Sequence, residues 1–113
     1  MKSKLRERTA GNAQAAKYLR GLGDPTRLTL LQLLAERGQM NVSQLVEATG
    51  VPQGRLSDHL ACLKWCNYVD SRREGKFVFY FINDQRVLTI LKLVQELAAE
   101  SADQLSDCSR IPD

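Results

Sequence analysis

The chain has 113 residues, a formal net charge of +3 and 43% hydrophobic residues, which fits one domain with a modest core. No run of about 18 apolar residues occurs, which excludes a membrane-spanning helix. The charged N-terminus is not followed by an apolar segment, so we expect a protein that stays in the cytoplasm. Three cysteines are an odd number, which argues against a disulfide framework and leaves metal binding, catalysis or inert burial open.

The charges are unevenly distributed along the chain. Residues 1–8 hold four bases and one acid, and residues 52–80 hold five bases and three acids. Residues 84–113 hold three bases and six acids. A polyanion is therefore a plausible partner of the first two thirds of the chain. The alternative is that these charges form ordinary solvated surfaces.

Two helices are expected in the first third of the chain. The first spans residues 9–22, with four apolar residues facing inward: Ala15, Ala16, Leu19 and Leu22. Asp24 is a good N-cap for the second helix, and Pro25 is a good first helical residue. Apolar residues then recur at helical spacing, and Gly38 ends the helix.

A helix-turn-helix pattern follows. Residues 39–42 form a short extended stretch, and Ser43 is expected to cap a helix that runs from Gln44 to Thr49. Residues 50–52 (Gly-Val-Pro) form a turn. A second helix runs from about Gln53 to Asn67, with a core stripe of three leucines: Leu56, Leu60 and Leu63. Two short helices joined by a glycine-containing turn are typical of helix-turn-helix motifs.

A β-hairpin and a last helix complete the chain. Residues 69–73 and 77–82 are rich in β-forming side chains, and Gly75 between them supplies a tight turn. A hairpin directly after the second helix is the sequence form of a wing. Asp84 then caps a helix to about Ala102 that carries two adjoining apolar stripes. One stripe can face the core, and the excess predicts contact with the same helix of a second subunit; the alternative is a fully buried helix in a monomer.

The expected fold class is mainly α with a small β-hairpin, a winged helix-turn-helix that forms a homodimer. We expect one domain over residues 1–113. Its core spans about residues 9–102, between a basic N-terminal arm at 1–8 and a C-terminal tail at 103–113.

The start of the second helix of the motif is the expected DNA-reading element, because such helices place their N-terminal polar residues against base edges. These residues are Gln53, Arg55, Ser57, Asp58 and His59. Arginine can pair with guanine and glutamine with adenine, whereas Asp58 could accept from a cytosine amino group or point away. The wing residues Arg72, Arg73 and Lys76 suit phosphate contact. His59 could instead be a hydrogen-bonding core residue.

Three segments together resemble the ArsR/SmtB family of metal-responsive repressors. They are Gly23-Asp24-Pro25-Thr26-Arg27, Ser57-x-His59-Leu60, and Arg73-Glu74-Gly75-Lys76 before an aromatic strand. The resemblance spans roughly residues 12–100. It implies a homodimer of winged-helix subunits joined through the first and last helices. It also implies repression of a resistance or transport operon, relieved by an inducer.

The family keeps its metal sites in different places, and two of these are absent here. Asn41 and Ser43 stand where one branch has a Cys-x-Cys pair, and Arg86 stands where another branch has a histidine ligand after Asp84. What remains resembles the CmtR-type cadmium/lead sensors, with a Cys-x-x-x-Cys in this helix and a third cysteine in the tail. The resemblance implies a metal site formed by Cys62, Cys66 and Cys108.

Sulfur chemistry agrees with such a site. Thiolates select soft ions such as cadmium, lead, mercury or trivalent arsenic, and sulfur donors alone do not separate these candidates. Nearby Lys64, and any basic residue folded over the site, could lower the thiol pKa. The alternative is that Cys62 and Cys66 are ordinary small apolar residues and that Cys108 is a stray tail thiol.

Other functions remain open. The chain could be a DNA-binding regulator whose cysteines sense oxidants or have no sensing role. It could also be a winged-helix module that binds proteins without DNA. An enzyme is not expected, because no nucleophile–base pair, glycine-rich phosphate loop or carboxylate pair stands out.

Overall fold

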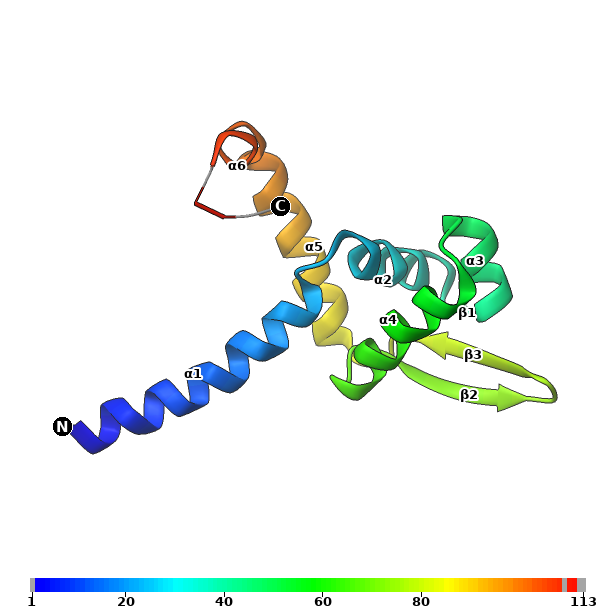
Figure 1. The fold of residues 1–113 in the computed structure, drawn as a ribbon, viewed down its shortest axis with the longest axis horizontal. Coiled ribbons are helices and arrows are strands. Elements are labelled where there is room, and N and C mark those ends of the chain that lie inside the picture. Colours follow the sequence, from blue (N-terminus) through cyan, green and yellow to red (C-terminus); the bar gives the residue numbers. More distant parts are fainter. Residues whose placement is uncertain (1, 109, 112–113) are drawn as a thin grey trace. The chain divides into compact units, whose positions relative to one another are not determined.

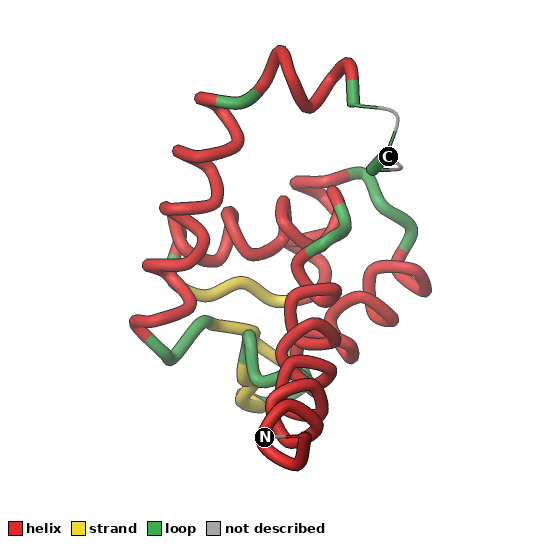
Figure 2. The backbone as a smooth tube through the Cα atoms, turned by 90° about the vertical axis from the view of Figure 1, so that its left-hand side faces the viewer, coloured by secondary structure: helices red, strands yellow, loops and turns green. Residues whose placement is uncertain are grey.

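The computed structural model of the chain describes residues 2–108, 110 and 111, in two compact units, Met1–Asn83 and Asp84–Asp113. The elements of the first unit are α1 (Lys2–Leu22), α2 (Pro25–Arg37), β1 (Gln39–Asn41), α3 (Val42–Thr49), α4 (Gln53–Trp65), β2 (Asp70–Glu74) and β3 (Phe77–Phe81). The second unit contains α5 (Gln85–Glu100) and α6 (Ala102–Asp107) (Figure 1). Figure 2 shows that helices make up most of the backbone and that the strands form one small sheet. The expected mainly helical fold with a β-hairpin is confirmed.

The α1 helix is longer and more exposed than expected. It begins at Lys2 instead of residue 9, because residues 2–8 are mostly good helix formers. Its expected inward face is wrong for three of four residues, since Ala15, Ala16 and Leu19 are exposed and only Leu22 is buried. The reason is that only the last turns of α1 pack on the rest of the unit, from which the helix projects (Figure 1).

The ends of α2 follow local rules. The Asp24 side chain accepts from the Arg27 N–H over 2.9 Å, Pro25 begins the helix, and Gly38 ends it at φ 85°. A left-handed φ of this kind favours glycine. The predicted cap, first residue and end of this helix are all confirmed.

The helix-turn-helix is confirmed with two shifted boundaries. Asn41, and not Ser43, caps α3, because its side chain accepts from the Gln44 N–H while the Gln44 side chain accepts from the Asn41 N–H. This reciprocal pair satisfies two backbone donors at once. The α4 helix ends at Trp65 instead of Asn67, because Asn67 has a left-handed φ of 64°.

The wing is the outer part of a three-stranded antiparallel sheet in the order β1-β3-β2. Glu74 pairs with Phe77, so Gly75 and Lys76 form a two-residue turn, with Gly75 at φ 60°. The short extended stretch before α3 is the third strand, in which Met40 pairs with Tyr80. The sheet therefore connects the wing to the segment that enters the helix-turn-helix.

The core of the first unit consists mainly of leucines from its helices. Burying one such side chain contributes about 1.5–3 kcal/mol. The side chains with almost no exposure are Leu30, Leu31, Leu34, Leu45, Leu56, Leu60, Leu63 and Tyr68. The expected stripe of α4, formed by Leu56, Leu60 and Leu63, is thus confirmed, and it fixes which side of α4 faces outward.

The second unit also differs from expectation at its end. Asp84 caps α5 as predicted, accepting from the Arg86 N–H over 2.9 Å. The helix ends at Glu100, and the segment expected as a tail forms the short helix α6. Val87 and Leu91 are buried, whereas Leu93, Val94 and Leu97 are exposed. Among the residues that the structure describes, no helix is long and apolar enough to cross a membrane.

Candidate nucleic-acid interface and thiol pair

The outward face of α4 carries four of the five residues expected to read DNA. Gln53, Arg55, Ser57 and Asp58 are exposed, because the three buried leucines turn the opposite side of the helix toward the core. No internal ion pair ties up Asp58 among the described residues of the chain. The first turns of α4 therefore present a row of polar groups to solvent.

The wing presents its three cations on exposed side chains. The Arg72 guanidinium lies 5.7 Å from the centre of the Phe79 ring and forms a 3.4 Å ion pair with Glu74. The Lys76 ammonium lies 5.4 Å from the Phe77 ring centre. Arg73 donates to the Gly75 carbonyl over 3.3 Å. Aromatic rings below cations restrict the positions that the cations sample.

His59 lies apart from the outward face of α4. Its side chain is only 18% exposed, and its Nδ1 atom lies 3.4 Å from a guanidinium nitrogen of Arg27 and 4.0 Å from a carboxylate oxygen of Asp24. The structure therefore turns this residue toward the start of α2. The sequence predicted Asp24 as the cap of this helix and assigned no role to Arg27 beyond the family resemblance.

The thiol pair lies on the same edge of α4 as His59, because residues three and four apart share one face of a helix. Cys62 and Cys66 are both half-buried and free, and the N–H of Cys66 donates to the carbonyl of Cys62 over 3.1 Å. Burial raises the pKa of the Cys66 thiol, and Cys62 raises it further through charge and hydrogen bonding. The positive charges of Lys17 and Arg27 act in the opposite direction.

The predicted lowering of the thiol pKa is wrong for Cys66, because burial and Cys62 outweigh the nearby positive charges. Those charges are Lys17 and Arg27, which fold over the site from other parts of the chain. Lys64 donates instead to the Ser71 hydroxyl over 2.7 Å. Sequence spacing could not identify Lys17, because its place beside Cys66 depends on the tertiary structure.

Two tyrosines hold the end of α1 beside the thiol pair. The rings of Tyr18 and Tyr68 lie 4.3 Å apart, and the Tyr68 hydroxyl donates to the Tyr18 carbonyl. A Cβ atom on Gly21 would lie only 2.9 Å from the Tyr68 ring. Burial raises the pKa of Tyr68, and Tyr18 and the two thiols contribute in the same direction. The thiols thus lie close to the end of α1 and to the loop that follows α4.

The donor set suits a soft ion. Two sulfurs one helical turn apart can converge on a large thiophilic ion, whereas hard ions prefer oxygen. In the described part of residues 2–83, no third histidine, cysteine, aspartate or glutamate joins the pair to form a three-ligand group. Cys108 belongs to the second unit, where it is half-buried and caps the C-terminus of α6. Trp65, next to Cys66, is 89% exposed, which the sequence analysis did not predict.

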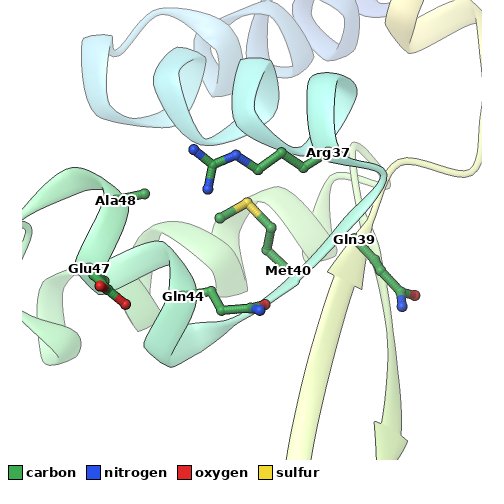
Figure 3. A pocket seen from close by; sticks show the side chains of 6 residues that line it. All are labelled: Arg37, Gln39, Met40, Gln44, Glu47 and Ala48. Carbon is green, nitrogen blue, oxygen red and sulfur yellow. The ribbon is translucent and has the colours of Figure 1, made fainter.

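A separate pocket of about 590 Å³ lies between the end of α2, β1 and α3. Arg37 extends over the Met40 sulfur toward Ala48, and Glu47 and Gln44 form another side (Figure 3). Gln44 is already engaged in capping α3. The described lining contains one soft donor, the Met40 thioether, and neither cysteine nor histidine, so the pocket lacks the thiolates of the proposed metal site.

The comparisons with known proteins agree with this architecture. Residues 24–71 match the family described as bacterial regulatory protein, arsR family. The chain is 45% identical over 97 residues to a probable mercury resistance operon repressor of Streptomyces lividans, covering 86% of this chain and 77% of that protein. It is 36% identical over 90 residues to the transcriptional regulator CmtR of Mycobacterium bovis, covering 79% and 75%.

A solved structure gives the same fold. It is a homodimeric winged helix-turn-helix DNA-binding domain from Mycobacterium bovis, with a TM-score of 0.74 and 35% identity over 81% of this chain and 84% of that chain. These relatives are regulators of transcription and not enzymes. The chain therefore belongs to the arsR family of bacterial regulatory proteins and has the winged helix-turn-helix fold.

Proposed function

We propose that the protein is a dimeric, cytoplasmic transcriptional repressor that binds operator DNA and is released when a soft metal ion binds its cysteine thiolates. The observation that carries the proposal is that α4 has polar, exposed residues at its start and a thiol pair near its end. One rigid helix therefore connects the groups that would read DNA with the groups that would bind the inducer.

The proposed DNA interface combines base reading and phosphate contact. Base contacts come from the exposed residues at the start of α4 (Gln53, Arg55, Ser57 and Asp58), and phosphate contacts come from the wing (Arg72, Arg73 and Lys76). His59, predicted for base contact as well, faces α2 and is left out of this interface. Arg55 is exposed, and its guanidinium can pair with both acceptors of guanine. The wing cations contribute affinity that does not depend on sequence and that falls with salt.

The proposed dimer covers apolar surface that a single chain leaves exposed. Leu5 and Leu19 of α1 and Leu93 and Leu97 of α5 are each at least 50% exposed. The related Mycobacterium bovis domain is homodimeric. A two-fold dimer also presents two reading helices to half-sites about 34 Å apart on DNA.

The proposed inducer site consists of Cys62, Cys66 and Cys108, and cadmium or lead is the favoured ion. Three thiolates and no histidine suit these large soft ions, and CmtR is one of the relatives. Mercury is the second candidate, because the relative at 45% identity is a probable mercury resistance operon repressor. Arsenite remains a third, since it also prefers sulfur.

Release follows from the packing around the thiols. The thiols lie close to Lys17 of α1 and to Tyr68, so a metal ion that draws the sulfurs together would disturb the contacts at the end of α4. Recruiting Cys108 would further change the order of the C-terminal segment. A coupling of about 1–3 kcal/mol between the two sites weakens DNA binding about 5- to 150-fold.

The test uses a fluorescent duplex selected from a random library by the metal-free protein. Cadmium, lead, mercury and arsenite are each titrated into the complex, and anisotropy reports DNA release. We expect release by at least one of these ions and none with the Cys62→Ser/Cys66→Ser variant. Cys108→Ser separates a three-sulfur site from a two-sulfur site. Equal release of the parent and the double variant would contradict the proposal.

A further inference from the structure

Two of the segments that identify the family meet in space. Asp24 and Arg27 lie at the start of α2, and His59 lies in the second turn of α4, 32 residues from Arg27 in sequence. The Arg27 side chain contacts two other parts of the first unit at once, the end of α1 and α4. It donates to the Gly21 carbonyl over 2.7 Å and to the Arg20 carbonyl over 3.0 Å, and it lies 3.4 Å from the Nδ1 atom of His59.

The chemistry of this contact makes it directional. A guanidinium can only donate, so Arg27 is the donor wherever the two groups form a hydrogen bond, with the unprotonated Nδ1 of His59 as its acceptor. The backbone N–H of Arg27 in turn donates to Asp24, whose carboxylate lies 4.0 Å from the same Nδ1 atom. Arg27 thereby joins the end of α1, the cap of α2 and the imidazole of α4.

The contacts of Arg27 give α4 a defined orientation, which the leucine core alone does not. Contacts of Leu56, Leu60 and Leu63 hold α4 against the unit, but apolar contacts are non-directional. A directional contact one turn after Arg55 limits rotation and sliding of the helix. The polar groups that face outward at the start of α4 need such a limit, because hydrogen bonds to base edges require defined distances and angles.

We propose that Arg27 is a positioning residue for the DNA-reading helix, which it holds through His59 in the orientation that matches the operator. The role rests on the proposed function, since it requires that α4 reads DNA. In this role Arg27 contacts the side of α4 that carries His59, and it does not itself contact phosphate.

The test compares Arg27→Gln with the parent protein on two duplexes, the library-selected one and a scrambled sequence, over a range of salt concentrations. We expect binding to the selected duplex to weaken about tenfold and binding to the scrambled duplex to change much less. The slope of log affinity against log salt stays unchanged. Arg73→Gln is the matched control, because losing a phosphate contact lowers that slope by about 0.9 and weakens binding to both duplexes.

A double-mutant cycle tests whether Arg27 acts through His59. If it does, Arg27→Gln/His59→Leu binds the selected duplex no more weakly than the worse single variant. The positioning role is overturned if the affinity loss of the double variant equals the product of the two single losses. It is also overturned if the salt slope of Arg27→Gln falls by about 0.9. Circular dichroism checks the helix content of each variant.

A second variant covers the case in which Arg27→Gln does not fold. Arg27→Lys keeps the charge but cannot donate in a fork to several acceptors, so it is expected to show the same selective loss. Full activity of Arg27→Lys overturns the proposal. If the parent protein itself binds both duplexes equally, the proposed function fails and this role fails with it. Selective binding by the parent with no loss in either Arg27 variant overturns the positioning role alone.

Discussion

Cys62 and Cys66 lie one helical turn apart at the end of α4, where the N–H of Cys66 donates to the carbonyl of Cys62 over 3.1 Å. The two thiols lie close enough for Cys62 to raise the pKa of Cys66, in addition to the effect of burial. Protonated thiols do not bind metal ions, because the thiolate is the ligand. A metal ion bound at the proposed site would therefore displace protons from the thiols.

The first prediction concerns pH. Because the pKa of Cys66 is raised, the thiol is protonated at neutral pH, and binding a metal must displace its proton. Metal affinity is expected to rise as pH increases from about 6 to about 8, a range below the ordinary thiol pKa of about 8.5. Ultraviolet thiolate-to-metal absorption and the emission of Trp65, the one tryptophan of the sequence, measure binding. A pH-independent affinity contradicts the prediction, and Cys62→Ser/Cys66→Ser is the control without the pair.

The second prediction concerns packing beside the thiols. Gly21→Ala is expected to lower stability by about 1–3 kcal/mol, because its Cβ would lie 2.9 Å from the ring of buried Tyr68. Gly11→Ala in the same helix is the matched control, since a Cβ there meets nothing within 4 Å. The free energy of unfolding of this control variant should increase by about 0.5–1 kcal/mol. Urea denaturation of both variants measures the difference, and equal stabilities would falsify the close approach.

The third prediction concerns the cap of α2. The Arg27 N–H holds the pKa of Asp24 below its usual value; burial opposes this lowering, and the charges of Arg27 and His59 add to it. A depressed pKa means that the stabilisation is present above the unfolded value of about 4 and is lost as pH falls through the folded value.

Substitution separates the cap from the charge. Asp24→Ala is expected to cost about 0.5–2 kcal/mol at pH 7. Asp24→Asn keeps an acceptor for the cap but loses this part of the pH dependence. Denaturation of the three proteins between pH 7 and 3 (roughly the range in which carboxylates titrate) measures both effects. A parallel decline of Asp24→Asn and the parent on acidification contradicts the assignment.

The fourth prediction concerns the wing. Glu74 is exposed and pairs with Arg72 over 3.4 Å, so it competes with phosphate for that guanidinium. Glu74→Gln is expected to tighten DNA binding a few-fold and to leave stability nearly unchanged, because exposed ion pairs contribute about 0–1 kcal/mol. Anisotropy at low salt measures affinity. Glu47→Gln, a change of the same charge on α3, is the control, and an equal gain there would indicate a general charge effect.

Local rules predicted much of the helix-turn-helix. Asp24 and Pro25 begin α2 and Gly38 ends it, because caps depend on neighbouring residues alone. The leucine stripe of α4 was read from its period. The cap of α3 could not be predicted from local rules, because two neighbouring residues are both suitable. Asn41 and Ser43 are both good caps, and the structure uses Asn41 because Gln44 completes the reciprocal pair.

Other features depend on residues that are far apart in the sequence. By itself the sequence determined the order of the helices, the turn of the wing at Gly75 and the presence of two cysteines on one face of α4, because these depend on spacing within a few residues. Only the tertiary structure brought Lys17 and Tyr18 beside the thiols and Arg27 against His59. Such contacts form when helices cross, and the crossing is set by the packing of the whole core, which no short stretch of sequence specifies.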